Sequence, residues 1–232
     1  MISELGDGLL SAESWGNKVN RLSTVHQLGF AVPPALCVQA ETLLLSSTQM
    51  ALEGWLQTYR PSKVVVRTSS MLEDTIETAR AGQSMSVADC EPNVDAIMDI
   101  VSKKIGPSLA SWASGTGGLS VMFQEQLSPR LAGVAFFEPD GEFIVELSTS
   151  GATDQITSGL RPDVVVRRRG PVVVADLARF ADAPIMRATH DILRLCEGLW
   201  AKFGFPIDVE WGWTMGASVV FQVRPITRPT GG

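Results

Sequence analysis

Four residues near the end of the sequence have the types and the spacing to bind a metal-nucleotide. Asp208 and Glu210 stand two residues apart, and Gln222 and Arg224 stand two residues apart a little further on. In proteins Mg²⁺ is usually held by one or two carboxylates together with the phosphates of a substrate. The fork of a guanidinium matches phosphate oxygens. If the four side chains meet, their chemistry therefore suits a metal ion and a phosphate chain.

A β-hairpin would bring these four residues to one face of a sheet. The segments Ile207–Trp213 and Ser218–Arg224 are typical of strands, and they turn around Gly216. Alternate residues of a strand share a face, so this register sets Asp208 opposite Arg224 and the second carboxylate opposite the amide. The inner face then holds the apolar pairs Trp211–Phe221 and Val209–Val223. The alternative is an ordinary amphipathic hairpin whose outer face carries only a cross-strand salt bridge between Asp208 and Arg224.

A lysine near the start of the chain occupies an unfavourable place in a predicted helix. Residues 16–29 carry apolar side chains at positions 19, 22, 25 and 28, which is helical spacing, and Gly29 ends the segment. Lys18 lies in the first turn, where a cation opposes the helix dipole. Local costs of this kind often mark a functional position. The alternative is a solvated surface lysine.

A third group of polar residues follows the apolar strand predicted over 63–67. Arg67 ends that strand, and residues 68–83 form a long stretch that is rich in hydroxyl groups. Long loops of this kind tend to be functional or disordered. Arg67 with Ser69 and Ser70 could surround a polyphosphate with guanidinium, hydroxyl and backbone donors. A flexible surface loop is the alternative.

Composition and charge narrow the class of protein. The chain has 232 residues, of which 45% are hydrophobic, so it can build one large core or two small lobes. Its net charge is −6, and 167–169 is the single basic run, so we expect no nucleic-acid partner. We expect no membrane partner and a cytoplasmic location, because the sequence shows no signal peptide and no apolar run of membrane-spanning length. Three scattered cysteines favour buried thiols over disulfides.

The remaining elements predict an α+β protein with two lobes. In the first lobe we expect a strand over 36–38 and a helix over 41–59 with Leu44, Leu45, Leu52, Trp55 and Leu56 facing inward. In the second we expect strands over 119–125, 131–137 and 142–147, a hairpin over 163–174, and a covering helix over 183–203. We place the boundary near Gly115–Gly118. The lobes are then 1–115 and 116–232.

Five blocks in this order resemble the nucleotide-binding domain of the family of pyruvate phosphate dikinase, phosphoenolpyruvate synthase and rifampin phosphotransferase. The terminal hairpin is similar to the family's D-x-E…Q-x-R-P ending at the correct spacing, and 64–70 resembles its V-R-S-S segment. The block at 64–70 continues with Glu73–Asp74 and Ala81–Gln83. The other three blocks are Gly16–Lys18 with Gly29–Pro34, Val121–Gln124 with Ala132–Val134, and Gly159 with Pro162–Asp163.

The resemblance implies an ATP-grasp fold, with two mainly antiparallel sheets flanked by helices and ATP between the lobes. On the matching positions, Lys18 and Arg67 would bind the polyphosphate. Glu210 and Gln222 would ligate Mg²⁺, with Asp208 and Arg224 supporting the metal and the phosphates. Arg67, Arg224 and Asp208 are thus the catalytic candidates. The other cofactor-binding candidates are Ser69, Ser70, Asp154 and Gln124, the last in the stretch 123–127 where adenine is expected.

The sequence also departs from the family. Asp154 replaces a glutamate of the family's Gly-Leu-Gly-Glu loop, and 108–118 lacks the usual arginine. His26 and His190 are the only histidines, and neither has the family's Thr-Ser-His context. We therefore do not expect this chain alone to run the dikinase relay.

Three functions remain open at this point. The first is an ATP-dependent phosphotransferase, or the ATP-binding subunit of one, acting on a small molecule or on a separate phosphohistidine (swivelling-domain) protein. The second is an ATP-grasp ligase that couples a carboxylate to an amine. The third is a degenerate nucleotide-binding protein that regulates a partner. The sequence does not identify the acceptor.

Overall fold

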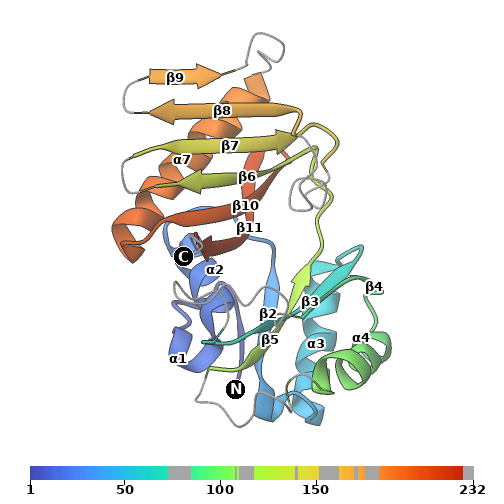
Figure 1. Ribbon diagram of the computed structural model, residues 1–232. Helices are drawn as coiled ribbons and strands as arrows, with labels where there is room; N and C mark the ends of the chain where they lie inside the picture. The colour runs from blue at the N-terminus through green and yellow to red at the C-terminus, as the bar shows by residue number, and fades with distance from the viewer. Residues whose placement is uncertain are drawn as a thin grey trace. The chain divides into compact units, whose positions relative to one another are not determined.

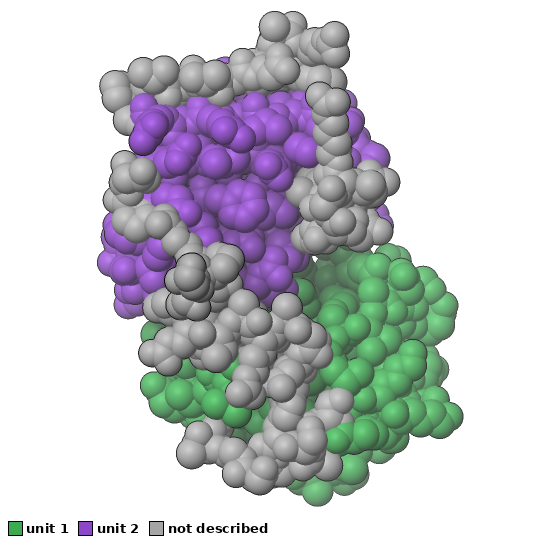
Figure 2. All heavy atoms as spheres, in the orientation of Figure 1, with its two compact units in different colours: residues 1–24, 33–127 green, residues 25–32, 128–232 purple. Residues whose placement is uncertain are grey.

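The chain divides into two compact units, each with its own sheet. The structure is a computed structural model, and it describes residues 1–72, 85–107, 109, 118–138, 141–151, 162–169, 172–175 and 183–226. Unit 1 comprises 1–24 and 33–127, and unit 2 comprises 25–32 and 128–232 (Figure 2). Among the helices that the structure describes, none combines the length and the apolar character needed to cross a membrane.

Unit 1 is built on a five-stranded antiparallel sheet in the order β1-β2-β5-β3-β4 (Figure 1). Its strands are β1 (Ile2–Glu4), β2 (Ala35–Gln39), β3 (Val64–Ser69), β4 (Ser86–Cys90) and β5 (Ser120–Glu125). Its helical elements are α1 (Ala12–Trp15), most of α2 (Asn17–Gln27), the 3₁₀ turn η1 (Ala40–Thr42), α3 (Ser46–Tyr59), α4 (Val94–Ile100) and the π-helical turn η2 (Val101–Ile105).

Alternation along the strands gives this sheet one apolar and one more polar face. On the apolar face, Val64, Val66 and Phe123 join a buried cluster with Leu52 and Trp55 of α3. The opposite face carries the alternate residues of the same strands, which include Arg67, Ser69, Ser120, Met122 and Gln124. The sheet is therefore fixed by its core on one side and presents the candidate polar residues on the other.

Helix α3 begins later than the sequence predicted. We expected a helix from residue 41 with Leu44 and Leu45 facing inward, but these side chains are 68% and 51% exposed. The first residues form the turn η1, and α3 starts only at Ser46. Leu52 and Trp55 are buried as predicted.

Unit 2 is a six-stranded antiparallel sheet in the order β11-β10-β6-β7-β8-β9. Helix α7 (Ala183–Phe203) packs on one face, where Ile185, Ile192 and Cys196 are buried as predicted (Figure 1). The rings of Trp200 on α7 and Phe137 on β6 lie 6.2 Å apart. The strands are β6 (Leu131–Phe137), β7 (Phe143–Ser148), β8 (Val164–Arg169), β9 (Val172–Ala175), β10 (Ile207–Thr214) and β11 (Ala217–Pro225).

The terminal hairpin forms where the sequence predicted it. Met215 and Gly216 connect the two strands, and both have positive φ angles, 51° and 84°. A two-residue loop with positive φ at both positions matches the twist of the strands that it joins. Val209, Trp211 and Trp213 are buried on the face that α7 covers.

The boundary between the units lies at 127/128, whereas we expected it at 115/116. The difference arises because β5 pairs with β2 and β3 and so belongs to the sheet of unit 1. Strand β4, which pairs with β3, was not predicted from the sequence.

Candidate functional site

The outer face of the terminal hairpin carries the four polar residues that the sequence singled out. Asp208 lies opposite Arg224 and Glu210 lies opposite Gln222, as predicted. One nitrogen of the guanidinium, Nη2 of Arg224, donates to Oδ2 of Asp208 at 3.0 Å and to Oε1 of Glu210 at 2.8 Å. The two carboxylate side chains are 17% and 15% exposed. Unit 2 thus holds two carboxylates, an amide and a guanidinium on one rigid face.

A β-bulge changes the predicted register next to these residues. Trp211 pairs with Val220 and not with Phe221, because the register shifts between Glu210 and Trp211. The prediction of a Trp211–Phe221 pair on the inner face was wrong. A bulge adds one unpaired residue to a strand, which turns that residue toward the other face. The tip of the Phe221 ring would lie 2.8 Å from a Cβ at Gly212, so this aromatic ring lies on the face that carries the carboxylates.

The side-chain oxygen atoms on this face are suitable ligands for a hard divalent cation. Two carboxylates two residues apart, with an amide oxygen opposite one of them, are the kind of ligands that Mg²⁺ takes beside the phosphates of a nucleotide. Among the described residues there is no group of three or more His, Cys, Asp or Glu side chains that could hold a metal by itself. The protein groups would therefore need oxygen ligands from a substrate to complete the coordination of the ion.

In unit 1, the start of helix α2 is fastened to the end of strand β3. The amide of Asn17 donates to the carbonyl of Ser70 at 3.1 Å, and the Asn17 side chain donates to the carbonyl of Met71 at 3.0 Å. The amide of Val19 donates to Oγ of Ser69 at 3.2 Å. The first N–H groups of a helix have no partner within the helix, and here residues some 50 positions away supply partners.

Gly16 makes this close contact possible. Its φ and ψ are 80° and 168°, a backbone conformation that is essentially restricted to glycine. A Cβ at this position would lie 2.5 Å from the backbone atoms of Ser69 and Ser70. The segment that contains Lys18 and the segment that contains Arg67 are therefore in direct contact.

Lys18, Ser69 and Ser70 are all largely buried at this junction, with exposures of 4%, 0% and 5%. The hydroxyl of Ser69 accepts from Val19, and the hydroxyl of Ser70 accepts from the amide of Leu72 at 3.0 Å. Both serines thus shape the turn that follows β3. Lys18 is the second residue after Gly16, in the first turn of α2, so its position depends on this packing.

Arg67 and Gln124 also lie together on the polar face of the sheet. Nη1 of Arg67 donates to Oε1 of Gln124 at 3.4 Å, and the Gln124 side chain is only 2% exposed. The amide nitrogen Nε2 of Gln124 is buried, and no described residue forms a hydrogen bond with it. Burying an N–H donor without an acceptor costs free energy, so an acceptor that lies beside this donor would be stabilised.

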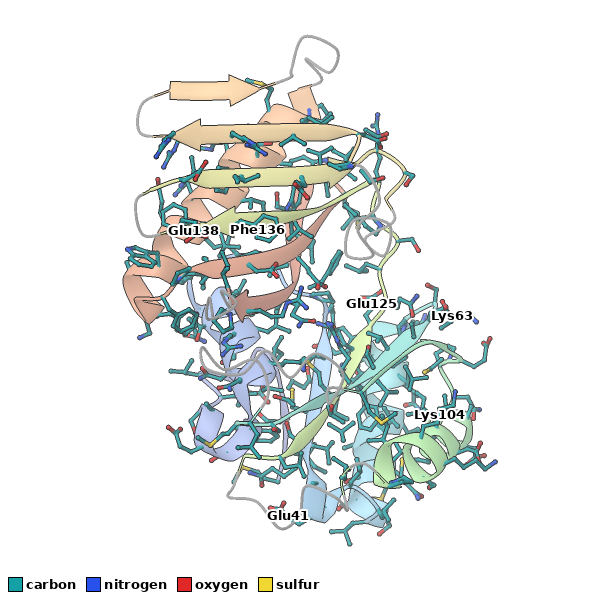
Figure 3. All side chains as sticks on the ribbon, viewed as in Figure 1. Glu41, Lys63, Lys104, Glu125, Phe136 and Glu138 are labelled. Carbon is teal, nitrogen blue, oxygen red and sulfur yellow. The ribbon has the colours of Figure 1, made fainter. Side chains whose placement is uncertain are left out.

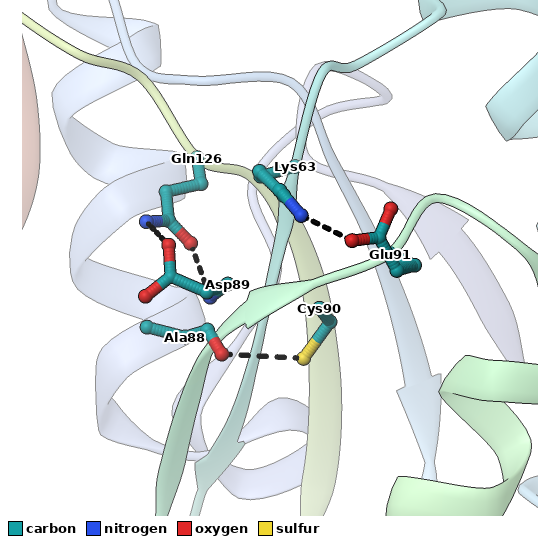
Figure 4. A network of polar contacts seen from close by, with 6 residues as sticks. All are labelled: Lys63, Ala88, Asp89, Cys90, Glu91 and Gln126. Carbon is teal, nitrogen blue, oxygen red and sulfur yellow. Dashed lines mark hydrogen bonds and ion pairs between the residues drawn. The ribbon is translucent and has the colours of Figure 1, made fainter.

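The stretch 123–127, where adenine was expected, is tied into unit 1. The amides of Glu125 and Gln126 donate to the carbonyls of Pro34 and Lys63. The Gln126 side chain accepts from the amide of Asp89 at 2.7 Å and donates to Oδ1 of Asp89 at 2.8 Å (Figure 4). These two backbone donors are thus already used within the unit.

Charged side chains surround the same stretch. Lys63 forms an ion pair with Glu91 (Figure 4), and Glu125 lies beside Val64 at the neighbouring ends of β5 and β3 (Figure 3). Burial raises the pKa of the Glu125 carboxyl above its usual range.

The loop that follows β7 is held by Asp163. Oδ2 of Asp163 accepts from the amide of Thr149 at 2.8 Å and from its hydroxyl at 2.9 Å. The hydrogen bond from the Thr149 amide is the main cause that lowers the pKa of Asp163. Gly151, at φ 75°, packs so tightly on Pro129 that no Cβ would fit. Asp154 lies outside the described residues, as do Glu73, Asp74, 81–83 and Gly159.

Sequence reasoning missed the residues that position the others. Gly16 was quoted as part of a motif but not as the contact point with Ser69, and the reciprocal pair of Asp89 and Gln126 was not noticed. Asp163 was matched to a motif without a role. A glycine directly before a helix and an aspartate beside a hydroxyl-rich loop were the available signals.

The chain matches no protein-family model and no curated protein. Its fold is similar to that of ACD1 from Ca. Korarchaeum cryptofilum in complex with coenzyme A, with a TM-score of 0.57 and 11% identity, covering 91% of this chain and 92% of that one. PH1788 from Pyrococcus horikoshii Ot3 is similar with a TM-score of 0.56 and 14% identity, covering 92% and 91% of the two chains.

A D-alanine–D-alanine ligase from Bacillus anthracis, solved with ATP, has a TM-score of 0.46 and 10% identity over 89% of this chain. This chain spans 53% of the length of that ligase. The fold class expected from the sequence, α+β of the ATP-grasp type with two mainly antiparallel sheets flanked by helices, is confirmed.

Proposed function

We propose that this chain binds Mg-ATP and acts as an ATP-dependent phosphotransferase, or as the nucleotide-binding part of one. The observation that carries the proposal is the register of the terminal hairpin. It sets Glu210 opposite Gln222 and Asp208 opposite Arg224 on a single face. The sequence predicted these pairs from the alternation of the strands and a turn centred on Gly216, and the same residues are the ones that the resemblance to the dikinase family implies for metal and phosphate binding.

Each unit contributes side chains that suit a part of Mg-ATP. In unit 2, Glu210, Gln222 and Asp208 supply oxygen atoms for the cation, and Arg224 supplies N–H donors for phosphate oxygens. When bound, Mg²⁺ neutralises charge on the phosphate oxygens of ATP. In unit 1, Lys18 and Arg67 supply positive charge for the phosphate chain.

Burial strengthens the electrostatic role of the unit 1 groups. Lys18 is held in place through Gly16 and through the hydrogen bond between Val19 and Ser69. Charges that are removed from water interact more strongly, so a lysine that is 4% exposed binds a phosphate better than a solvated one does. Groups fixed in advance also need no reorganisation when the phosphoryl group is transferred.

The acceptor in this proposal comes from outside the chain. His190 is 68% exposed on α7, and His26 lies on helix α2, so neither belongs to the polar sets described above. We infer that the phosphoryl group passes to a small molecule or to the histidine of a separate partner protein. The reaction breaks one phosphoanhydride bond of ATP, forms one bond from phosphorus to an oxygen or a nitrogen of the acceptor, and releases ADP. If AMP is the product, a second phosphoanhydride bond is hydrolysed and phosphate is released as well.

The products of ATP consumption test the proposal. The protein is incubated with Mg-ATP and candidate acceptors, and ³¹P NMR identifies the products. ADP or AMP that forms together with a phosphorylated acceptor supports the phosphotransferase. ADP and free phosphate that form only when a carboxylic acid and an amine are both present would show a ligase instead. Nucleotide binding with no turnover under any of these conditions would show a regulatory binding protein.

A further inference from the structure

The position of the Arg224 guanidinium resembles that of a bound cation. Its Nη2 atom lies 3.0 Å from a carboxylate oxygen of Asp208 and 2.8 Å from one of Glu210. A single positive group therefore touches both acids at once, as a shared metal ion would. The usual pairing of an arginine with one carboxylate uses two nitrogens and two oxygens side by side, and this geometry is different.

We propose that Arg224 is a placeholder for the metal: it neutralises Asp208 and Glu210 while the nucleotide is absent, and it turns to the phosphates when Mg-ATP enters. This inference rests on the proposed function and adds an order of events to it. Free Mg²⁺ is kept out of the empty protein, and the ion enters together with its nucleotide.

The charges on the hairpin explain why a placeholder is needed. Asp208 and Glu210 share one face and are both largely buried, so their mutual repulsion is costly without a cation nearby. One guanidinium offsets part of the two negative charges. A divalent ion that competes for the same oxygens must displace the guanidinium, which lowers its apparent affinity for the empty protein.

The exposure of Arg224 allows the exchange. Its side chain is 34% exposed, about twice as much as either carboxylate, so it can rotate without disturbing the core of unit 2. A guanidinium that leaves two carboxylates needs a new anion, because burying an unpaired charge is unfavourable. The phosphates of ATP supply that anion at the moment when Mg²⁺ supplies the carboxylates with a new cation.

Binding of Mn²⁺ in the absence of nucleotide tests the exchange. The free ion gives an EPR signal that is lost on binding, so the dissociation constant can be measured without any activity. In Arg224→Met we expect the affinity for Mn²⁺ to rise at least tenfold over the wild-type protein, because both carboxylates lose the guanidinium that they share. An affinity within twofold of wild type, or a lower one, would overturn the inference.

Arg168→Met is the matched control, because Arg168 pairs with a single carboxylate, Glu197, on the other face of the sheet. It should leave Mn²⁺ binding unchanged.

The double variant Arg224→Met with Glu210→Gln should not show the increased affinity for Mn²⁺. This result would show that the ion binds at the hairpin. If Arg224→Met does not fold, Arg224→Gln removes the charge while keeping a polar side chain at this half-exposed position, and the same tenfold rise is expected.

The two proposals fail in different ways. If the wild-type protein binds Mg-ATP but neither arginine variant gains affinity for Mn²⁺, the placeholder is wrong and the nucleotide site stands. If the wild-type protein does not bind Mg-ATP in a calorimetric titration, the proposed function fails and the placeholder fails with it.

Discussion

Replacing Gly16 with alanine tests whether the contact between helix α2 and strand β3 holds unit 1 together. An alanine must adopt φ 80° and ψ 168°, a strained conformation that costs about 1–3 kcal/mol. Its Cβ would also lie 2.5 Å from the backbone of Ser69 and Ser70, and overpacking of this kind costs about 1–3 kcal/mol more. We therefore expect Gly16→Ala to lower the free energy of unfolding by about 3 kcal/mol or more.

Gly8→Ala separates backbone strain from the clash. Gly8 lies in the same unit, its φ is 133°, and apart from its chain neighbours no described residue has an atom within 4 Å of the position that a Cβ would take. This control should cost only the strain, about 1–3 kcal/mol. Urea unfolding at constant m value gives both differences, and amide exchange at Val19 reports on the hydrogen bond to Ser69. If Gly16→Ala costs no more than Gly8→Ala, the contact between the two segments is refuted.

Three further predictions follow from the described contacts. Arg67→Lys should weaken Mg-ATP binding about tenfold in a calorimetric titration, because an ammonium group cannot make a forked contact with phosphate, and equal affinities would remove Arg67 from the site. The pKa of Asp163 is lowered on folding, so its contribution to stability is present above the unfolded pKa of about 3.9 and is lost as the pH falls through the folded value. The stability difference between wild type and Asp163→Asn should therefore shrink in melts below about pH 4, and a difference that grows toward acid would contradict this. Burial raises the pKa of the thiols of Cys37, Cys90 and Cys196, so a disulfide reagent should label them quickly only after unfolding; rapid labelling of the native protein would show that they are accessible.

The hairpin was predictable because its pattern is local. Alternation of apolar and polar residues sets the faces of a strand, and a turn centred on Gly216 predicts the Asp208–Arg224 pair without a structure. The loop is formed by Met215 and Gly216, with Thr214 opposite Ala217, so the predicted pair forms only because the bulge shifts the register by one residue. The bulge was not predictable from the same pattern. It keeps Glu210 opposite Gln222 but moves Phe221 to the other face, and nothing in the alternation marks the extra residue.

Long-range pairing limited the rest of the prediction. Residues 120–125 were recognised as a strand, but their partners β2 and β3 lie far away in the sequence, so the strand was given to the wrong lobe. The contact of Gly16 with Ser69 spans more than fifty residues and has no local signature beyond the glycine itself. Leu44 and Leu45 were placed inside because helical spacing continued through a segment that forms a 3₁₀ turn.

The most direct test of metal-nucleotide binding at the hairpin is the rise in melting temperature that Mg-ATP causes in wild type and in Glu210→Gln. A ligand that binds only the folded state stabilises it by about 2.7 kcal/mol at a hundred times its dissociation constant. Without ligand the variant should differ from wild type by less than about 1 kcal/mol, because Arg224 keeps Asp208 as a partner. Glu197→Gln, which removes the carboxylate that pairs with Arg168, is the control and should keep the full rise. We predict that Glu210→Gln loses most of the rise, and a variant that keeps all of it would show that Glu210 does not hold the metal.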